Sequence, residues 1–281
     1  MKTGIRNYYI DRYGLDEGAR LMAEHGYAYI DLQFTNTETE YYSAREEDFI
    51  EKIYAIKKGL AKHGISVSQI HGPWRIPQDA TEDDRAERFG KMTKAMVIAK
   101  HLGAKYMAVH PLMPYGANSP RNPEEVYAIN KKYYEALAKV GAGLGVTVCL
   151  ENMPFQDFPL SSCESIIKLV KDIDHPNLKI CFDTGHANLL GDRSGDCVRA
   201  IGDLLKILHL HDNDGTEDTH LPPYDGNFDW ADFIEGLYDI GYDGVMSLET
   251  EPIKEKDKAL SPEEITAREL SLAKYAKLLA E

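Results

Sequence analysis

Short apolar runs alternate with long helical patterns along the whole chain, and this alternation constrains the fold more than any other feature. Eight runs have the length and apolar or β-branched character of buried strands: Gly4 to Tyr9, Tyr27 to Phe34, Ile65 to His71, Lys105 to His110, Val146 to Glu151, Lys179 to Asp183, Lys206 to His211 and Gly244 to Glu249. Helical patterns follow most of them, for example at Glu46 to His63, Asp84 to His101, Glu124 to Val140 and Pro262 to Leu279. Such alternation is typical of parallel strands joined by crossover helices. The sequence therefore predicts an α/β fold, a (β/α)8 TIM barrel.

The length of 281 residues fits this fold as one domain, because such barrels routinely reach about 250 residues. No low-complexity tract or linker indicates a second domain, so we expect a single domain over residues 1–281. The N-terminus lacks the apolar stretch of a signal peptide, and no run of about 18 apolar residues occurs. Four cysteines without CxxC spacing indicate reduced thiols. We therefore expect a cytoplasmic protein that does not enter membranes.

The chain carries a formal net charge of -14. Nucleic-acid binding depends largely on Lys and Arg side chains that displace counterions from phosphates. The acidic charge therefore disfavours a nucleic-acid partner. A homo-oligomer remains open at this level.

Polar residues gather where the predicted strands end. Six of the ten histidines fall at or just past these ends: His71, His110, His186, His209, His211 and His220. Three acidic residues take the same position, Glu151, Asp183 and Glu249. Any one of them alone is as readily an ordinary polar loop residue. All strands of a parallel barrel end on one face, where barrel enzymes place their catalytic groups, so six consecutive strands ending this way predict one site.

Three other histidines lie at predicted helix ends: His25 and His63 directly before a glycine, and His101 two residues before Gly103. Glycine readily adopts the left-handed conformation that ends a helix, and a histidine there faces the negative end of the helix dipole. A structural role at the helix ends therefore accounts for these three histidines.

Electrostatics predicts a metal in the strand-end cluster. Three carboxylates about 5 Å apart repel one another by ~3 kcal/mol per pair at an effective dielectric near 20. Such a cluster must protonate or hold a cation, and neighbouring neutral imidazoles favour the cation. Glu151, Asp183, His211 and Glu249 form an oxygen-rich set suited to Mn²⁺, Mg²⁺, Co²⁺ or Zn²⁺. The sequence does not choose among these ions.

At these residues the chain resembles the xylose isomerase-like TIM barrel superfamily, which includes sugar and sugar phosphate isomerases and epimerases and also endonuclease IV-type AP endonucleases. The likeness extends over most of the chain, from His71 to Glu249. For the epimerases, the resemblance implies that Glu151, Asp183, His211 and Glu249 hold the metal. It also implies that the two glutamates face opposite sides of the bound sugar and move its proton.

The resemblance to the nucleases implies two further metal sites. His71 and His110, with Glu151 as a bridge, would hold a second metal, and His186, Asp218 and His220 would hold a third. His186 and His220 are also candidates for substrate binding. His209 precedes His211 by two residues, so we expect it to point into the barrel and to support the ligands rather than bind metal.

Two features bear on the substrate. Trp74 follows His71 closely and either forms an apolar wall against a sugar ring or packs a loop. The ketohexose epimerases of the superfamily carry an arginine six residues after the strand-end histidine, where this chain has Glu217, which argues against the usual free ketohexose. Asp229 is expected to cap the helix that follows it.

These residues lead to a functional hypothesis: a metal-dependent isomerase or epimerase that moves a proton α to a carbonyl of a sugar or polyol derivative through an enediolate, with Glu151 and Glu249 as catalytic bases. One alternative is an endonuclease IV-type AP endonuclease. A second is a lyase or dehydratase acting on a keto-sugar, keto-glycoside or inosose. A third is a metal- or sugar-binding module without activity.

Overall fold

A computed structural model describes residues 1–281 apart from 75–78, 251 and 253–259. Its strands are β1 (Lys2–Arg6), β2 (Tyr29–Gln33), β3 (Ser66–His71), β4 (Tyr106–Val109), β5 (Thr147–Glu151), β6 (Leu178–Asp183), β7 (Leu205–His209) and β8 (Val245–Leu248). They pair in parallel in the order β7-β6-β5-β4-β3-β2-β1-β8. A parallel bridge between Leu210 and Leu248 joins the two ends of this order. The chain thus forms the predicted (β/α)8 TIM barrel.

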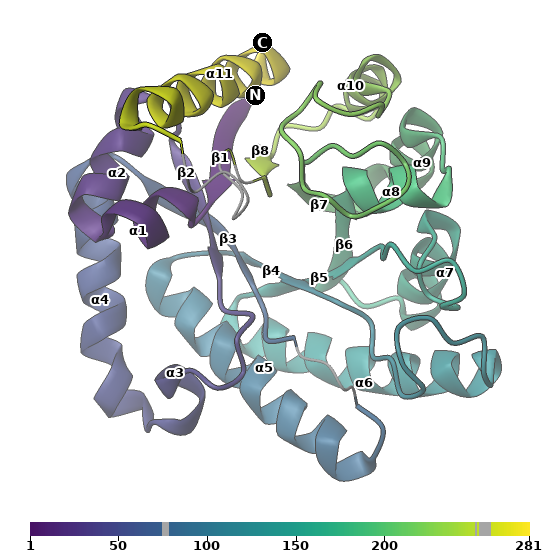
Figure 1. Ribbon diagram of the computed structural model, residues 1–281. Helices are drawn as coiled ribbons and strands as arrows, with labels where there is room; N and C mark the ends of the chain where they lie inside the picture. The colour runs from purple at the N-terminus through teal and green to yellow at the C-terminus, as the bar shows by residue number, and fades with distance from the viewer. Residues whose placement is uncertain (75–78, 251, 253–259) are drawn as a thin grey trace.

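Helices surround the strands on the outside of the barrel (Figure 1). They are α1 (Tyr8–Tyr13), α2 (Leu15–Glu24), α3 (Glu40–Ser43), α4 (Glu46–Lys62), α5 (Glu82–Leu102), α6 (Pro123–Leu144), α7 (Cys163–Ile173), α8 (Thr184–Leu190), α9 (Ser194–Ile201), α10 (Trp230–Asp239) and α11 (Pro262–Ala280), with a 3-10 turn, η1 (Gly202–Leu204), before β7. None of the helices among the described residues has the length and apolar character of a membrane span.

The first strand lies further toward the N-terminus than its sequence predicted. The expected strand ran from Gly4 to Tyr9, but β1 ends at Arg6 and Tyr8 begins a helix. The two tyrosines are buried as a strand would bury them, yet their hydroxyls serve helix contacts: Tyr8 donates to Glu269 of α11 at 3.0 Å, and Tyr9 lies 2.7 Å from His25 Nδ1. The burial of these two aromatic side chains therefore made the start of a helix look like the end of a strand in the sequence.

The predicted helix ends are confirmed. The glycines after them have positive φ angles: 86° at Gly26, 77° at Gly64 and 90° at Gly103. The three histidines beside them contact neighbouring elements, with His25 on Tyr9, His63 on Asp16 and His101 on Glu46. Asp229 also caps α10 as expected, because its side chain accepts from the backbone N–H of Asp232 at 3.1 Å.

The barrel interior is polar at the C-terminal ends of the strands and apolar deeper inside. Ala108, Cys149, Cys181 and Ile207 form a small buried cluster inside it. Successive side chains alternate between the two faces of a strand, so residues two apart share a face. Two residues beyond Cys149, Cys181 and Ile207 stand Glu151, Asp183 and His209. The apolar cluster therefore forms a floor under the strand-end residues.

Candidate metal centre and active site

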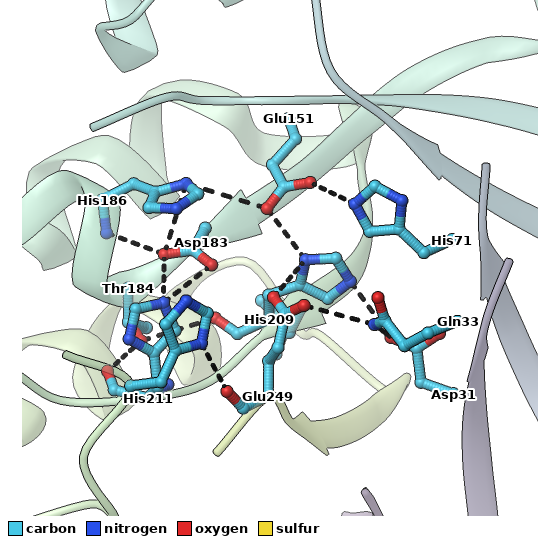
Figure 2. Close-up of polar contacts among 12 residues, drawn as sticks. Asp31, Gln33, His71, Glu151, Asp183, Thr184, His186, His209, His211 and Glu249 are labelled. Carbon is cyan, nitrogen blue, oxygen red and sulfur yellow. Dashed lines mark hydrogen bonds and ion pairs between the residues drawn. The ribbon is translucent and has the colours of Figure 1, made fainter. Parts of the chain in front are cut away.

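The strand ends bring nine of the predicted site residues together at the C-terminal mouth of the barrel (Figure 2 shows most of them). They are His71 from β3, His110 just after β4, Glu151 from β5, Asp183 from β6, His186 from α8, His211, Asp218 and His220 from the segment after β7, and Glu249 just after β8. Glu151, Asp183 and His211 are almost wholly buried. Asp218 and His220 are partly exposed, so the cluster opens to solvent on their side.

His71, His110 and Glu151 form a compact triangle. His71 Nε2 lies 3.1 Å from His110 Nε2, and Glu151 Oε2 lies 3.4 Å and 3.3 Å from these two nitrogens. A point about 1.9 Å from all three atoms lies at the centre of such a triangle, close to the ~2.0–2.1 Å of zinc–nitrogen bonds. These three side chains fit a divalent transition-metal ion.

Asp183 and His211 form a second focus of the cluster. His211 Nε2 lies 3.0 Å and 3.1 Å from the two carboxylate oxygens of Asp183. On the solvent side, Asp218 Oδ2 lies 3.3 Å from His186 Nε2 and 3.4 Å from His220 Nε2. His186, Asp218 and His220, which the resemblance groups around one metal, therefore do converge.

Backbone carbonyls fix the orientation of three imidazoles. Nδ1 of His71 lies 2.8 Å from the carbonyl of Gly72, Nδ1 of His186 lies 2.8 Å from that of Asn152, and Nδ1 of His220 lies 2.7 Å from that of Glu249. A carbonyl only accepts, so each Nδ1 is the donor and each Nε2 is left to face the cluster. Metal-binding histidines are usually held by such a contact on the other ring nitrogen.

Glu249 is held toward Glu151 rather than toward Asp183. Its Oε2 lies 3.0 Å from His209 Nδ1, and its Oε1 accepts from Gln33 Nε2 at 3.2 Å. The same His209 nitrogen lies 2.8 Å from Glu151 Oε1. The four residues expected to share one metal therefore form two pairs, Asp183 with His211 and Glu151 with Glu249, the second pair joined by an imidazole.

His209 agrees with its predicted supporting place, but its partners were not predicted. It is fully buried, and its Nε2 lies 3.1 Å from Asp31 of β2. Asp31 also accepts from Gln69 of β3 at 3.1 Å. Burial opposes the charge on His209, yet Cys181 and the carboxylates of Glu151 and Glu249 raise its pKa well above the ordinary value. The sequence signal for Asp31 was a lone acidic residue inside an apolar strand run.

Uncharged groups position Asp183 and His211. The Asn152 side chain accepts from the backbone N–H of Asp183 at 2.8 Å and donates to its carbonyl at 2.9 Å. The Thr184 hydroxyl donates to the His211 carbonyl at 2.7 Å and accepts from its N–H at 3.0 Å. A Cβ on Gly185 would lie 2.0 Å from the His211 ring, so only glycine leaves room for this imidazole.

Charges within the cluster shift several pKa values. Burial lowers the pKa of His110 to about 4. Burial acts in the same direction on His186 and His220, but Asp183 and Asp218 outweigh it at His186 and raise its pKa to about 10, and Asp218 and Glu249 raise that of His220 to about 9. In turn, hydrogen bonds from these two imidazoles overcome burial and lower the pKa of Asp218. His186 and His220 thus favour their protonated forms, and Asp218 between them favours its ionised form.

The rim carries the remaining predicted residues. The Trp74 ring stands edge-on to His110, with centroids 4.9 Å apart, which places this tryptophan beside the cluster. Glu217 is exposed next to Asp218.

Buried Asp212 orders the loop between β7 and α10, because its carboxylate accepts from Trp230 Nε1 at 2.8 Å and from the N–H groups of Tyr224 and Phe228 at 3.0 and 3.1 Å.

Comparisons with known proteins agree with this architecture. The curated relatives include the uncharacterized protein MJ1311 of Methanocaldococcus jannaschii, 32% identical over 197 residues, which cover 68% of this chain and 66% of that protein. They also include a D-psicose 3-epimerase of Agrobacterium fabrum, 26% identical over 203 residues, which cover 70% and 68%. The matches thus span about two thirds of each relative.

A solved structure extends the agreement in fold to nearly the whole chain. The IOLI protein, with a binding zinc atom, is similar to this chain with a TM-score of 0.77 at 20% identity, over 99% of this chain and 97% of that one. Residues 19–275 match the family described as xylose isomerase-like TIM barrel. The resemblance read from the strand-end residues is confirmed, and the chain belongs to the xylose isomerase-like TIM barrel family.

Proposed function

We propose that this protein is a metal-dependent sugar isomerase or epimerase, which moves a proton α to a carbonyl of a small sugar or polyol derivative. The observation that carries the proposal is the pair of carboxylates, Glu151 and Glu249, held on one buried imidazole at 2.8 and 3.0 Å beside a cluster of further histidines. The likeness to a D-psicose 3-epimerase supports the same reaction class.

We assign the metal ligands from the family resemblance together with the side chains gathered at the barrel mouth. Glu151, Asp183, His211 and Glu249 would hold the ion that contacts substrate, and the triangle of His71, His110 and Glu151 fits a second ion. His186, Asp218 and His220 are the candidates for a third, or for contacts to the substrate. When bound, a divalent ion supplies Lewis acidity that polarises a carbonyl oxygen. The zinc atom in the structure of the IOLI protein supports zinc among the candidates, which also include Mn²⁺, Co²⁺ and Mg²⁺.

The side chains divide the remaining work. Glu249, the more exposed of the two glutamates, would take the proton from the substrate carbon, and Glu151 would return one from the other side. His209 holds both carboxylates in place from below, and Gln33 fixes the free oxygen of Glu249. Trp74 offers an apolar wall to a ring face. Glu217 in place of a cationic residue favours a neutral substrate other than the usual free ketohexose.

The experiment follows a hydrogen isotope. Sugars and keto-polyols are incubated in deuterium oxide with the wild-type chain and with Glu249→Gln and Glu151→Gln, and α-carbon exchange is followed by NMR. General acid–base groups contribute about 10²–10⁴ in rate, so each variant should lose at least about a hundredfold. Glu51→Gln, an exposed change on α4, should exchange like wild type. Undiminished exchange in Glu249→Gln would remove its assignment as a base. The same spectra separate an isomer product from a dehydrated or eliminated one.

The convergence of the His71–His110–Glu151 and His186–Asp218–His220 groups also favours a second candidate, an endonuclease IV-type AP endonuclease. The net charge of -14 opposes binding to a phosphate backbone. Incubation with abasic duplex DNA at low salt and saturating metal tests this alternative. We expect no incision, and efficient cutting would replace the sugar proposal with the nuclease.

A further inference from the structure

A second group of metal-binding side chains lies away from the barrel mouth. Cys163 is the first residue of α7, Asp192 follows the end of α8, and Cys197 lies in α9. The two sulfur atoms and one carboxylate oxygen all lie within 4.8 Å of one another. Both thiols are free. Cys163 is buried, whereas Asp192 and Cys197 are partly exposed, so solvent reaches the group from one side.

Two of the three residues are held toward their neutral forms, and one contact orients the carboxylate. The backbone N–H of Cys163 donates to Asp192 Oδ2 at 3.4 Å, which turns the carboxylate toward the thiols. The neighbouring Cys197 and burial raise the pKa of the Cys163 thiol, and burial raises the pKa of the Asp192 carboxyl. Two thiols and a carboxyl, each of which is an anion when it ligates a metal, share a partly buried space. A cation bound among them would stabilise the ionised forms of all three groups.

We propose that Cys163, Asp192 and Cys197 form a binding site for a thiophilic divalent cation of the zinc type, separate from the metal centre at the barrel mouth. Two thiolates and a carboxylate are ligands that zinc accepts, at about 2.3 Å for sulfur and about 2.0–2.2 Å for oxygen. Around a tetrahedral ion such atoms stand roughly 3.5–3.8 Å apart, and the three atoms here lie within 4.8 Å of one another. The fourth position is left to water from the exposed side.

The position of this site gives it a structural role. Helix α8 begins at Thr184, between Asp183 and His186 of the barrel mouth, and ends at Leu190, two residues before Asp192. A metal bound to Asp192 would tie the far end of this short helix to α7 and α9. The zinc-type site would thus fix the C-terminal end of a segment whose N-terminal end carries two residues of the candidate active site.

The test reads the metal–sulfur bond, which the oxygen and nitrogen ligands of the barrel mouth do not provide. The full chain is reduced, stripped of metal and titrated with Cd²⁺ and with Co²⁺, while thiolate-to-metal charge-transfer absorption is recorded. We expect a band whose intensity at saturation corresponds to one thiolate-bound ion per chain, and protection of the partly exposed Cys197 in a thiol count. Cys163→Ser and Cys197→Ser should each abolish it. Asp192→Asn should weaken the affinity by about tenfold or more, as loss of a charged ligand does.

One control variant and one test variant show which thiols produce the band. Cys181 also has its sulfur within 4.8 Å of ligand atoms of Glu151 and His209, so Cys181→Ala must keep the band if the proposal holds. Cys197 is partly exposed, so its serine variant provides a folded test even if Cys163→Ser fails to fold. A band that survives in Cys197→Ser, or no band while all four thiols remain free, overturns the proposal. So does a pair that only forms a disulfide in air and binds no ion when reduced.

Discussion

His209 Nδ1 lies 2.8 Å from Glu151 Oε1, with Glu249 at 3.0 Å from the same nitrogen and Asp31 at 3.1 Å from the opposite one. The buried imidazole, whose pKa is raised well above its ordinary value, is thus an internal cation beneath the carboxylates. The metal expected from the sequence rested on the repulsion among the acids and on neighbouring imidazoles taken as neutral. His209 offsets part of that repulsion, and the ligand atoms above it still converge on ion-sized spaces.

Replacing this imidazole should lower the stability of the fold. His209→Asn removes the positive charge and leaves Asp31, Glu151 and Glu249 buried without their common partner. Removing one member of a buried charged group typically costs about 3–5 kcal/mol. Chemical denaturation of the metal-free chain should show a loss of this size. His63→Asn, whose imidazole pairs with an exposed carboxylate at a helix end, should change stability by less than about 1 kcal/mol. Equal effects of the two variants would contradict the role given to His209.

A single methyl group should disturb the metal centre through packing alone. Gly185→Ala places a Cβ 2.0 Å from the His211 ring and must displace that imidazole from Asp183. We expect a fall in metal affinity of about tenfold or more, measured by competition with a chelating dye. Gly90→Ala on α5 meets open space and should stabilise the helix by about 0.5–1 kcal/mol without changing metal binding. Unchanged affinity in Gly185→Ala would contradict the placement of His211 as a ligand.

Metal binding should release protons. The pKa of His186 is raised to about 10 and that of His220 to about 9, so at neutral pH both imidazoles are protonated in the metal-free chain. Metal ligation requires the neutral ring nitrogen, so these protons must leave as the ion binds. Affinity should therefore rise as the pH increases from about 6.5 to 9. Calorimetric titrations in two buffers of different ionisation enthalpy measure the released protons, and zero release at pH 7 would remove both residues from the ligand set.

The same raised pKa values affect the stability of the metal-free chain. An imidazole whose pKa is higher when folded stabilises the fold fully below its unfolded pKa and loses that contribution as the pH rises through the folded pKa. The contributions of His186 and His220 should accordingly fade between about pH 6.5 and pH 9–10. Denaturation midpoints across this interval should fall for the wild type and fall less for His186→Asn. Parallel curves would contradict the charge assigned to His186.

The barrel and much of its mouth could be predicted because parallel strands force their ends onto one face. That single constraint placed His71, Glu151 and Asp183 together although they are far apart in the sequence. The boundary of β1 was wrong because Tyr8 and Tyr9 are buried for reasons of helix packing, and apolar periodicity does not distinguish short helical turns from strands.

Pairings within the mouth could not be predicted, since they depend on side-chain direction. The sequence grouped Glu249 with Asp183 and His211, whereas its carboxylate lies on His209 and Gln33. Asp31 and Gln69 were missed because they lie inside strands, whereas the predicted site residues lie at strand ends. Their signal, a charged or amide side chain within an otherwise apolar run, marks a buried polar group that needs a partner.

In the proposed enzyme, acidic and imidazole side chains from separate strands hold a metal ion. Proton transfer on the sugar requires this ion. The most direct test measures α-proton exchange by NMR in one preparation before chelation, after exhaustive chelation with the metal content checked, and after adding back Mn²⁺, Co²⁺ or Zn²⁺. We expect exchange to stop in the metal-free chain and to return with at least one ion. Full exchange in protein shown to be metal-free would contradict the proposed role of the metal.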